Sequence, residues 1–336
     1  MQTYARLSFT EREEISRGLS AGIGIRELGR RLGRDTGTVS REVTSAGMTS
    51  LTYRAESGQK RADVQAKTSR KIRKLEANEA LRQYVYAGLR RSWSPEEVSK
   101  RLKKEYPLDM DMRVSNETVY THLYCLPRGE LRKELLSYLR QEGKLRGDRK
   151  SGKDRRGQIP EMVSIEERPA EVAERTVPGH WEGDLILGAS GKSAVGTLVE
   201  RTTRFLLLVR LAGRDAASVR TAFATAVSDL PDNLKKSLTY DRGKEMAEHL
   251  GFTSDTGIQV YFAHPHAPWE RGTNENTNGL LRQYLPKGTD LAPFSEEDLR
   301  KIQNEMNGRP RAALDFFTPF EAMKALLTNQ PVALGA

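Results

Sequence analysis

Five short apolar segments between residues 181 and 263 constrain the fold of this chain more than any other feature of its sequence. The first three follow one another at short spacing, which predicts an antiparallel meander of strands. The last two alternate with segments of helical periodicity. The strands are expected at 181–187, 194–199, 205–211, 237–240 and 258–263, and the helices at 215–230 and 245–252. This order predicts an α/β domain with a mixed five-stranded sheet.

The charge of the chain is distributed unevenly. Residues 1–160 hold 35 Lys and Arg against 21 Asp and Glu, whereas residues 161–336 hold 20 against 24. A basic first half predicts a polyanion as partner, most simply nucleic acid. The single cysteine, Cys125, excludes an intramolecular disulfide and a cysteine-based zinc site, and it fits a reducing cytoplasm. No apolar run approaches the roughly 20 residues that a membrane span needs, so no membrane partner is expected.

Three carboxylates in the second half are the candidate metal ligands and catalytic residues. Asp184 falls in the first predicted strand, Asp241 directly after the fourth, and Glu275 in a helical pattern that begins after residue 268. A single acid of this kind is more often a local hydrogen-bonding group, so the prediction depends on all three together. If they converge, they form a hard oxygen site for Mg²⁺ or Mn²⁺. Two such ions can activate a water or a 3′-hydroxyl and stabilise the leaving oxygen of a phosphodiester.

Polar neighbours on the helix of Glu275 allow two interpretations each. Arg271, Glu275, Asn278 and Arg282 recur at spacings of four, three and four residues and therefore share one helix face. The two arginines either meet a DNA strand or pair with the acids. Asn274 and Asn278 either orient Glu275 and contact DNA, or serve only helix capping and surface polarity.

Two tryptophans flank the candidate site in the sequence. Trp181 lies three residues before Asp184, and Trp269 lies two residues before Arg271. Both are expected in the core or in the wall of the site, where Trp181 would support the acids.

The first 50 residues carry the pattern of a helix-turn-helix. Thr10 and Glu13 have capping-box spacing, and three short helices are predicted, the first ending near Leu19 and the others at 25–32 and 36–43. The candidate groove-facing residues are Thr36, Thr38, Ser40 and Arg41, and those for phosphate contacts are Arg26, Arg30, Arg31 and Arg34. A generic helical bundle with a solvated basic face is the alternative.

A second helix-turn-helix is predicted between residues 91 and 142. Ser94, Pro95 and Glu97 have the order of a helix N-cap, first position and third position. A further helix is expected to begin after Ser115. Its exposed candidates for DNA contact are Ser115, Asn116, Thr118 and Thr121.

A run of Gly, Lys and Arg at 143–158 contains almost no apolar residues and cannot bury a core. It predicts a domain boundary. The predicted division is a helix-turn-helix domain at 1–53, a basic helical linker at 54–90, a second helical domain at 91–142, a flexible basic linker at 143–176 and the catalytic domain at 177–336.

Three stretches resemble the DDE transposases of bacterial insertion sequences, specifically those of insertion-sequence family thirty. They are Pro178–Asp184, Tyr240–Gly243 and the long run Glu270–Asp290. Thirty-three residues separate Asp241 from Glu275, which matches the spacing of that family. Asn307–Arg311 and Phe317–Glu321 are similar to its C-terminal signature, so the resemblance covers nearly the whole chain.

The resemblance implies a ribonuclease H-like catalytic domain in which Asp184, Asp241 and Glu275 hold two Mg²⁺ or Mn²⁺ ions. It also implies binding to the terminal inverted repeats of an insertion sequence, cleavage that frees a 3′-hydroxyl, and attack of that hydroxyl on target DNA. Because two DNA ends must be joined, a homodimer or larger assembly is expected.

Two other functions compete with this one. A sequence-specific DNA-binding regulator would use the basic half and leave the nuclease-like domain idle, although the presence of all three acids argues against it. A ribonuclease H-type nuclease or a retroviral-type integrase is the other alternative. Integrases of that type carry a His/Cys zinc module near the N-terminus, and this chain has no histidine before His122.

Overall fold

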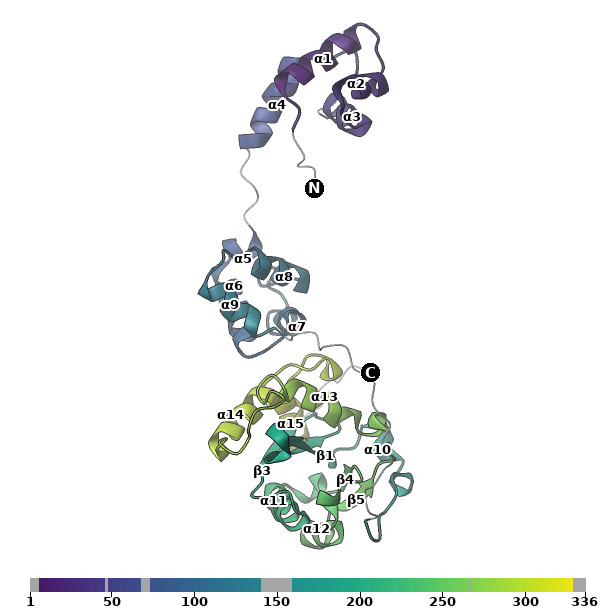
Figure 1. Ribbon diagram of the computed structural model, residues 1–336, viewed down its shortest axis with the longest axis vertical. Coiled ribbons are helices and arrows are strands. Elements are labelled where there is room, and N and C mark those ends of the chain that lie inside the picture. Colours follow the sequence, from purple (N-terminus) through teal and green to yellow (C-terminus); the bar gives the residue numbers. More distant parts are fainter. Residues whose placement is uncertain (1–5, 46–47, 68–72, 140–158, 266, 329–336) are drawn as a thin grey trace. The chain divides into compact units, whose positions relative to one another are not determined.

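The computed structural model describes residues 6–45, 48–67, 73–139, 159–265 and 267–328 (Figure 1). The chain divides into two compact units, residues 1–73 and residues 74–336. Among the described residues, no helix has both the length and the apolar character needed to cross a membrane.

The first unit is a bundle of short helices around one small core. Its helices are α1 (Phe9–Ser20), α2 (Ile25–Leu32), α3 (Thr36–Thr44) and α4 (Ala55–Lys67). The first three lie where the sequence predicts them. Ile15, Val39, Val43 and Tyr53 are fully buried in the core. Gly33 adopts a left-handed conformation (φ 62°) at the end of α2, which turns the chain into α3.

The start of α1 differs from the prediction. Ser8 is the N-cap, and it forms a capping box with Glu11: the Ser8 hydroxyl accepts the Glu11 N–H, and the Glu11 carboxylate accepts the Ser8 N–H at 2.6 Å. Thr10 therefore lies inside the helix. Both positions have capping-box spacing, and burial of Leu7 immediately before Ser8 anchors the chain at the earlier one.

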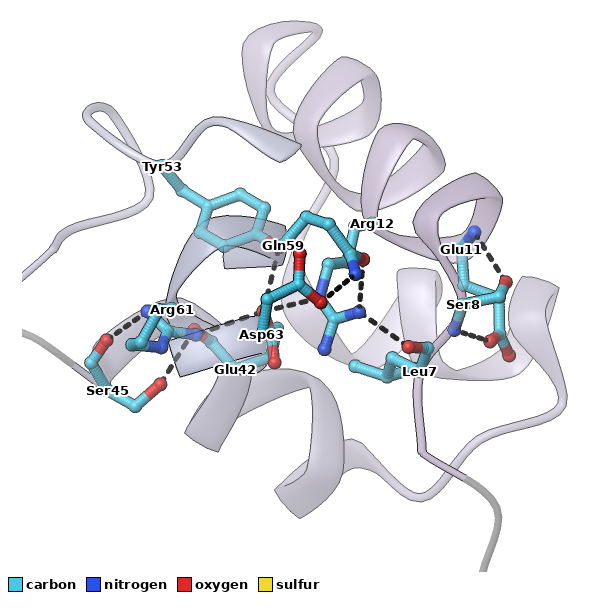
Figure 2. A network of polar contacts seen from close by, with 10 residues as sticks. All are labelled: Leu7, Ser8, Glu11, Arg12, Glu42, Ser45, Tyr53, Gln59, Arg61 and Asp63. Carbon is cyan, nitrogen blue, oxygen red and sulfur yellow. Dashed lines mark hydrogen bonds and ion pairs between the residues drawn. The ribbon is translucent and has the colours of Figure 1, made fainter. Parts of the chain in front are cut away.

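A polar network fastens α3 to its neighbours (Figure 2). The largely buried Glu42 carboxylate accepts hydrogen bonds from Arg12 of α1 and Arg61 of α4, both at 3.0 Å, and from the Tyr53 hydroxyl at 3.2 Å. Arg12 also donates to the carbonyl of Leu7 at 2.6 Å. Because these partners come from α1, from α4 and from the segment before α4, one largely buried carboxylate ties α3 to several parts of the unit.

The segment 54–90, for which the sequence predicts a basic helical linker, contains helices that contribute to both units. Its first helix, α4, packs on α1 in the first unit. Its last helix, α6 (Glu79–Arg90), buries Leu81, Val85 and Leu89 in the second unit. The few apolar residues that make these contacts lie among many Lys, Arg and Gln residues, so the sequence pattern does not indicate that they are buried. The domain boundaries predicted from the sequence remain a proposal.

The N-terminal part of the second unit is helical. Its helices are α5 (Lys74–Ala77), α6, α7 (Pro95–Glu105), α8 (Asn116–Cys125) and α9 (Glu130–Ser137). The caps are those expected from the sequence: Ser94 and Glu97 form a capping box on α7, and Ser115 caps α8. Arg309 and Glu97 form a buried ion pair (3.0 Å) that joins α7 to the C-terminal segment of the same unit.

A five-stranded mixed sheet forms the rest of the second unit, as predicted. Its strands are β1 (His180–Leu187), β2 (Ala194–Glu200), β3 (Leu206–Arg210), β4 (Ser237–Tyr240) and β5 (Gln259–Phe262). The order across the sheet is β3-β2-β1-β4-β5. The first three strands are antiparallel, and β4 and β5 run parallel to β1. The central strand β1 therefore has β2 on one side and β4 on the other.

Helices cover the two faces of this sheet. One core joins Trp181, Leu238 and Val260 to α11 (Ala216–Ser228) and α12 (His249–Thr256). The other joins Ile186 and Val195 to α13 (Gly272–Leu281) and α14 (Glu296–Asn307). The remaining elements are η1 (Ile165–Glu167), α10 (Glu171–Glu174), η2 (Ala189–Gly191), η3 (Asp232–Leu234), η4 (Lys244–Met246), η5 (Pro268–Arg271), η6 (Ala312–Leu314) and α15 (Pro319–Leu327).

Candidate active site

Two of the three predicted acids lie side by side because β1 and β4 are adjacent parallel strands. Asp184 projects from β1, and Asp241 follows the last residue of β4. Both carboxylates face the guanidinium of Arg271, at 3.7 Å from Asp184 and 3.4 Å from Asp241. Burial raises the pKa of the Asp184 carboxyl above its ordinary value; Arg271 opposes this shift and Asp241 adds to it. Two carboxylates held this close favour a cation between them.

Helix α13 contributes the remaining groups of the site. Asn278 donates from its side-chain amide to the Asp184 carboxylate at 3.0 Å, and Arg271, at the N-terminal end of the helix, donates to the carbonyl of Gly183 at 3.0 Å. Glu275 lies between these two residues at an exposed position of α13. Within the described parts of the chain, no three His, Cys, Asp or Glu side chains lie close enough together to hold a metal ion. The role of Glu275 as a third ligand therefore stays a prediction.

The donor set nevertheless suits a divalent cation. Asp184 and Asp241 offer carboxylate oxygens, the ligands that Mg²⁺ and Mn²⁺ prefer. The positive charge of Arg271 lies against both of them, and a bound cation would supply the same compensation. Asp184 and Asp241 therefore fit a divalent cation, because both carboxylates already face one positive charge.

A buried glutamate on the same strand as Asp184 is a residue that the sequence interpretation missed. Glu182 lies two residues before Asp184 on β1, and its side chain is 0% exposed. Its carboxylate pairs with Arg201 at 2.7 Å and accepts the backbone N–H of Asn274 at 2.8 Å. The signal was present, because an acid in the middle of an otherwise apolar strand is rarely left buried without a partner.

Asn274 completes this connection between the strand and the helix. Its side-chain amide donates to the carbonyl of Glu182 at 2.9 Å, and its amide oxygen accepts the Thr197 hydroxyl of β2 at 3.2 Å. Asn274 is therefore a structural link between β1, β2 and α13, one residue before Glu275. Its orientation into the protein argues against direct contact with DNA.

Two further predicted site residues have mainly structural contacts. Trp181 is buried in the sheet core, where its indole N–H donates to the carbonyl of Leu234 at 2.8 Å. Arg282 lies at the C-terminal end of α13 and donates to the carbonyl of Leu285 at 3.2 Å. Trp269, which was expected in the core or wall of the site, is instead largely exposed.

The predicted DNA-contacting residues of the first unit differ in solvent exposure and in their ion-pair partners. Arg26, Thr36 and Arg41 are exposed, whereas Thr38 and Ser40 are half-buried on α3. Arg30 and Arg31 are exposed, and both pair with Glu27. Arg34 lies in the turn between α2 and α3 and forms an ion pair with Glu11 of α1 at 2.7 Å, so its guanidinium already has a carboxylate partner.

The predicted DNA-contacting residues of the second helical region also include some that bond to neighbouring residues and some that are exposed. Ser115 and Thr118 bond to each other at the start of α8, while Asn116 and Thr121 are exposed. His122 is buried against the Tyr86 hydroxyl at 2.8 Å. Cys125 is exposed at the end of α8.

Two family models match the chain. A helix-turn-helix domain matches residues 3–44, and an integrase core domain matches residues 174–268. Together with the paired aspartates at the centre of the sheet, they define a DNA-recombining enzyme with a ribonuclease H-like catalytic domain and a divalent-metal-dependent site.

Full-length relatives give the family. The chain is 46% identical to the transposase for insertion sequence element IS1086 of Cupriavidus metallidurans, over 97% of this chain and 96% of that protein. It is 42% identical to the transposase InsI for IS30A of Escherichia coli, over 95% of this chain and 84% of that protein, and 34% identical to the transposase for IS4351 of Bacteroides fragilis, over 97% and 98%. The chain belongs to the IS30 family of DDE-type transposases.

Proposed function

We propose that this transposase binds the terminal inverted repeats of an insertion sequence and uses Asp184, Asp241 and Glu275 to cleave and transfer DNA strands. The observation that carries the assignment is the approach of Asp184 and Asp241 to one guanidinium, at 3.7 and 3.4 Å. Two Mg²⁺ or Mn²⁺ ions are the proposed cofactors. When bound, they would neutralise charge at the scissile phosphate and favour the ionised form of the attacking hydroxyl.

The residues of the chain itself are proposed to position the reacting groups. Asn278 holds the Asp184 carboxylate in one orientation through its 3.0 Å hydrogen bond. Arg271 is bound to the backbone of β1 and lies where it can meet a phosphate oxygen once the acids have another cation. Phosphoryl transfer depends chiefly on such positioning and charge neutralisation.

DNA recognition is proposed for the exposed faces of α3 and α8. Thr36 and Arg41 would reach base edges, helped by Thr38 and Ser40, while Arg26, Arg30 and Arg31 would meet phosphates. Asn116 would contact DNA from α8, with Ser115 and Thr118 at the helix start. We further propose that two or more copies act together on paired ends, in the cytoplasm, because transposition joins two ends to one target.

The test is a strand-transfer assay with the full chain. The protein is mixed with a labelled duplex that carries its terminal repeat and with a supercoiled plasmid, in Mg²⁺, in Mn²⁺ and in chelator. We expect metal-dependent joined products that disappear in Asp241→Asn and in Glu275→Gln, while binding to the duplex is retained. Asp232→Asn is the matched control, since Asp232 is fully exposed on η3.

Products that persist in Asp241→Asn would show that the site assignment is wrong. Products that persist in Glu275→Gln would remove Glu275 from the ligand set. Repeat binding without cutting in either metal would favour the DNA-binding regulator.

A further inference from the structure

One aromatic side chain beside the candidate site is not accounted for by the proposed chemistry. Trp269 is 73% exposed, whereas Trp93 and Trp181 are 5% and 1% exposed. An indole buries more apolar surface than almost any other side chain, and exposing one in water forfeits that gain. A single exposed tryptophan next to a reaction centre therefore suggests a surface that binds a flat, apolar face.

The residue after Trp269 is hydrogen-bonded to two other segments of the unit. This residue, Glu270, accepts the backbone N–H of His264 at 2.7 Å and pairs with the His264 imidazole at 2.8 Å. Arg201 donates to the carbonyl of Glu270 at 3.4 Å. Two residues after Trp269, Arg271 touches both aspartates. The indole thus lies on η5, a short element that is hydrogen-bonded to His264 and Arg201 through Glu270 and continues directly into the candidate site.

The charges around η5 favour an anionic chain over a neutral partner. Arg242 donates to the carbonyl of Ala263, next to His264, and Arg168 lies within electrostatic reach of Glu270. The bond to Glu270 also raises the pKa of the His264 imidazole, which favours its charged form. With Arg271, four basic groups lie along this stretch, next to the acids Glu166 and Glu270 and to Asp184 and Asp241, whose charge a bound metal cation would offset. A phosphate backbone running past an exposed aromatic ring fits this arrangement.

We propose that Trp269 is a stacking platform for the terminal base at the cut end of the DNA strand. The inference rests on the proposed function, which brings a strand end to the acids. Bases inside a duplex are covered on both faces, but the base at a cut end has one free face, so an indole can stack on it without breaking the duplex. Stacking of one base on an aromatic side chain is worth about 1–3 kcal/mol.

Intrinsic fluorescence tests this directly, because the other two tryptophans are buried. The full chain is titrated, in chelator so that no strand is cut, with a terminal-repeat duplex that ends at the cleavage position. The comparison DNA is the same duplex with that end closed by a hairpin loop. We expect quenching by the open end, little by the closed end, and loss of the signal in Trp269→Phe.

Affinity gives the second readout. Trp269→Ala should weaken binding of the open-ended duplex about 5- to 150-fold, the range that corresponds to the stacking energy at about 1.4 kcal/mol per tenfold change. Trp269→Phe should recover part of this loss. Leu250→Ala is the control, because Leu250 is an exposed apolar residue on α12, outside the candidate site. It should bind as the parent does.

Three results would overturn the stacking proposal. Equal quenching by open and closed ends would show contact with the side of a duplex. A blue shift that grows with protein concentration in the absence of DNA would show that Trp269 contacts a second copy. Unchanged affinity in Trp269→Ala, with normal metal-dependent cleavage, would leave the proposed function intact and remove only the platform. Open-end quenching in a chain that never cuts would instead keep the platform and remove the proposed function.

Discussion

Two glutamates with little solvent exposure, Glu42 in the first unit and Glu182 in the second, have related roles with different consequences. Glu42 lies on α3 of the first unit and is held by Arg12, Arg61 and Tyr53. Glu182 lies on β1 of the second unit and is held by Arg201 and the backbone of Asn274. Each glutamate accepts charge-assisted hydrogen bonds at a position with little access to water, where such bonds are strong, and so holds a helix in place. Glu42 orients a candidate DNA-reading helix, and Glu182 positions the helix of Glu275.

The surroundings of the two glutamates are not equivalent. The first unit is small, and its buried apolar core consists of only a few side chains, so the polar network is a large part of what holds α3. In the second unit, a five-stranded sheet with a hydrophobic core on each face holds β1 independently of Glu182. The comparison teaches that the same device supports folding in one unit and site geometry in the other.

The largest effect is expected from Glu42→Ala. Removing this carboxylate leaves Arg12 and Arg61 without their shared partner, which costs about 3–5 kcal/mol for a buried ion pair. For a unit of this size, that is a large part of the total stability. Hydrogen exchange on the full chain should show faster exchange through α1, α3 and α4, and no change in the sheet. Exchange that stays slow in α3 would mean that its apolar contacts suffice.

Glu182→Gln should give the complementary result. Glutamine can still accept the Asn274 N–H but cannot neutralise Arg201, so α13 should shift against β1 while the sheet remains folded. A misplacement of reacting groups by about 1 Å lowers the reaction rate by about 100-fold. We expect strand transfer to fall by about that factor, with terminal-repeat binding unchanged. A fall in binding equal to the fall in rate would contradict a positioning role.

Gly183→Ala tests β1 as the support of the site. An added Cβ would lie 2.7 Å from a ring carbon of the fully buried Tyr240, so the strand or the ring must move. Overpacking of this kind costs about 1–3 kcal/mol. A lower melting temperature and weaker strand transfer are expected. Gly272→Ala is the matched control, because nothing lies within 4 Å of its added Cβ and its backbone is already helical (φ −60°).

The smallest effect is a pH dependence in the first unit. The hydrogen-bonded ion pair between Glu11 and Arg34 lowers the pKa of the Glu11 carboxyl from 4.5 to about 2. A depressed pKa in the folded state contributes stability above the unfolded value, and this contribution is lost as the pH falls from about 4.5 to about 2. Acid unfolding of α1 and α2 should therefore begin below pH 4.5 and be less steep in Glu11→Gln. An identical acid transition in that variant would show that the pair contributes nothing, as exposed pairs often do.

The amino-acid sequence determined most of the local structure. The spacing of apolar residues predicted the five strands and their mixed sheet, and the serines before α7 and α8 predicted where those helices begin. The choice between two capping boxes at the start of α1 was beyond it, because both have the same spacing and only the burial of Leu7 decides between them.

Sequence also nominated Asp184, Asp241 and Glu275, since strand ends and helix faces are local properties. The tertiary structure alone decided what these residues meet. Pairing of β1 with β4 brings Asp184 and Asp241 to the same guanidinium, although 56 residues separate them in the sequence. The burial of Glu182 and the exposure of Trp269 likewise depend on how distant segments pack. Periodicity shows which face a side chain occupies, but only packing shows what covers that face.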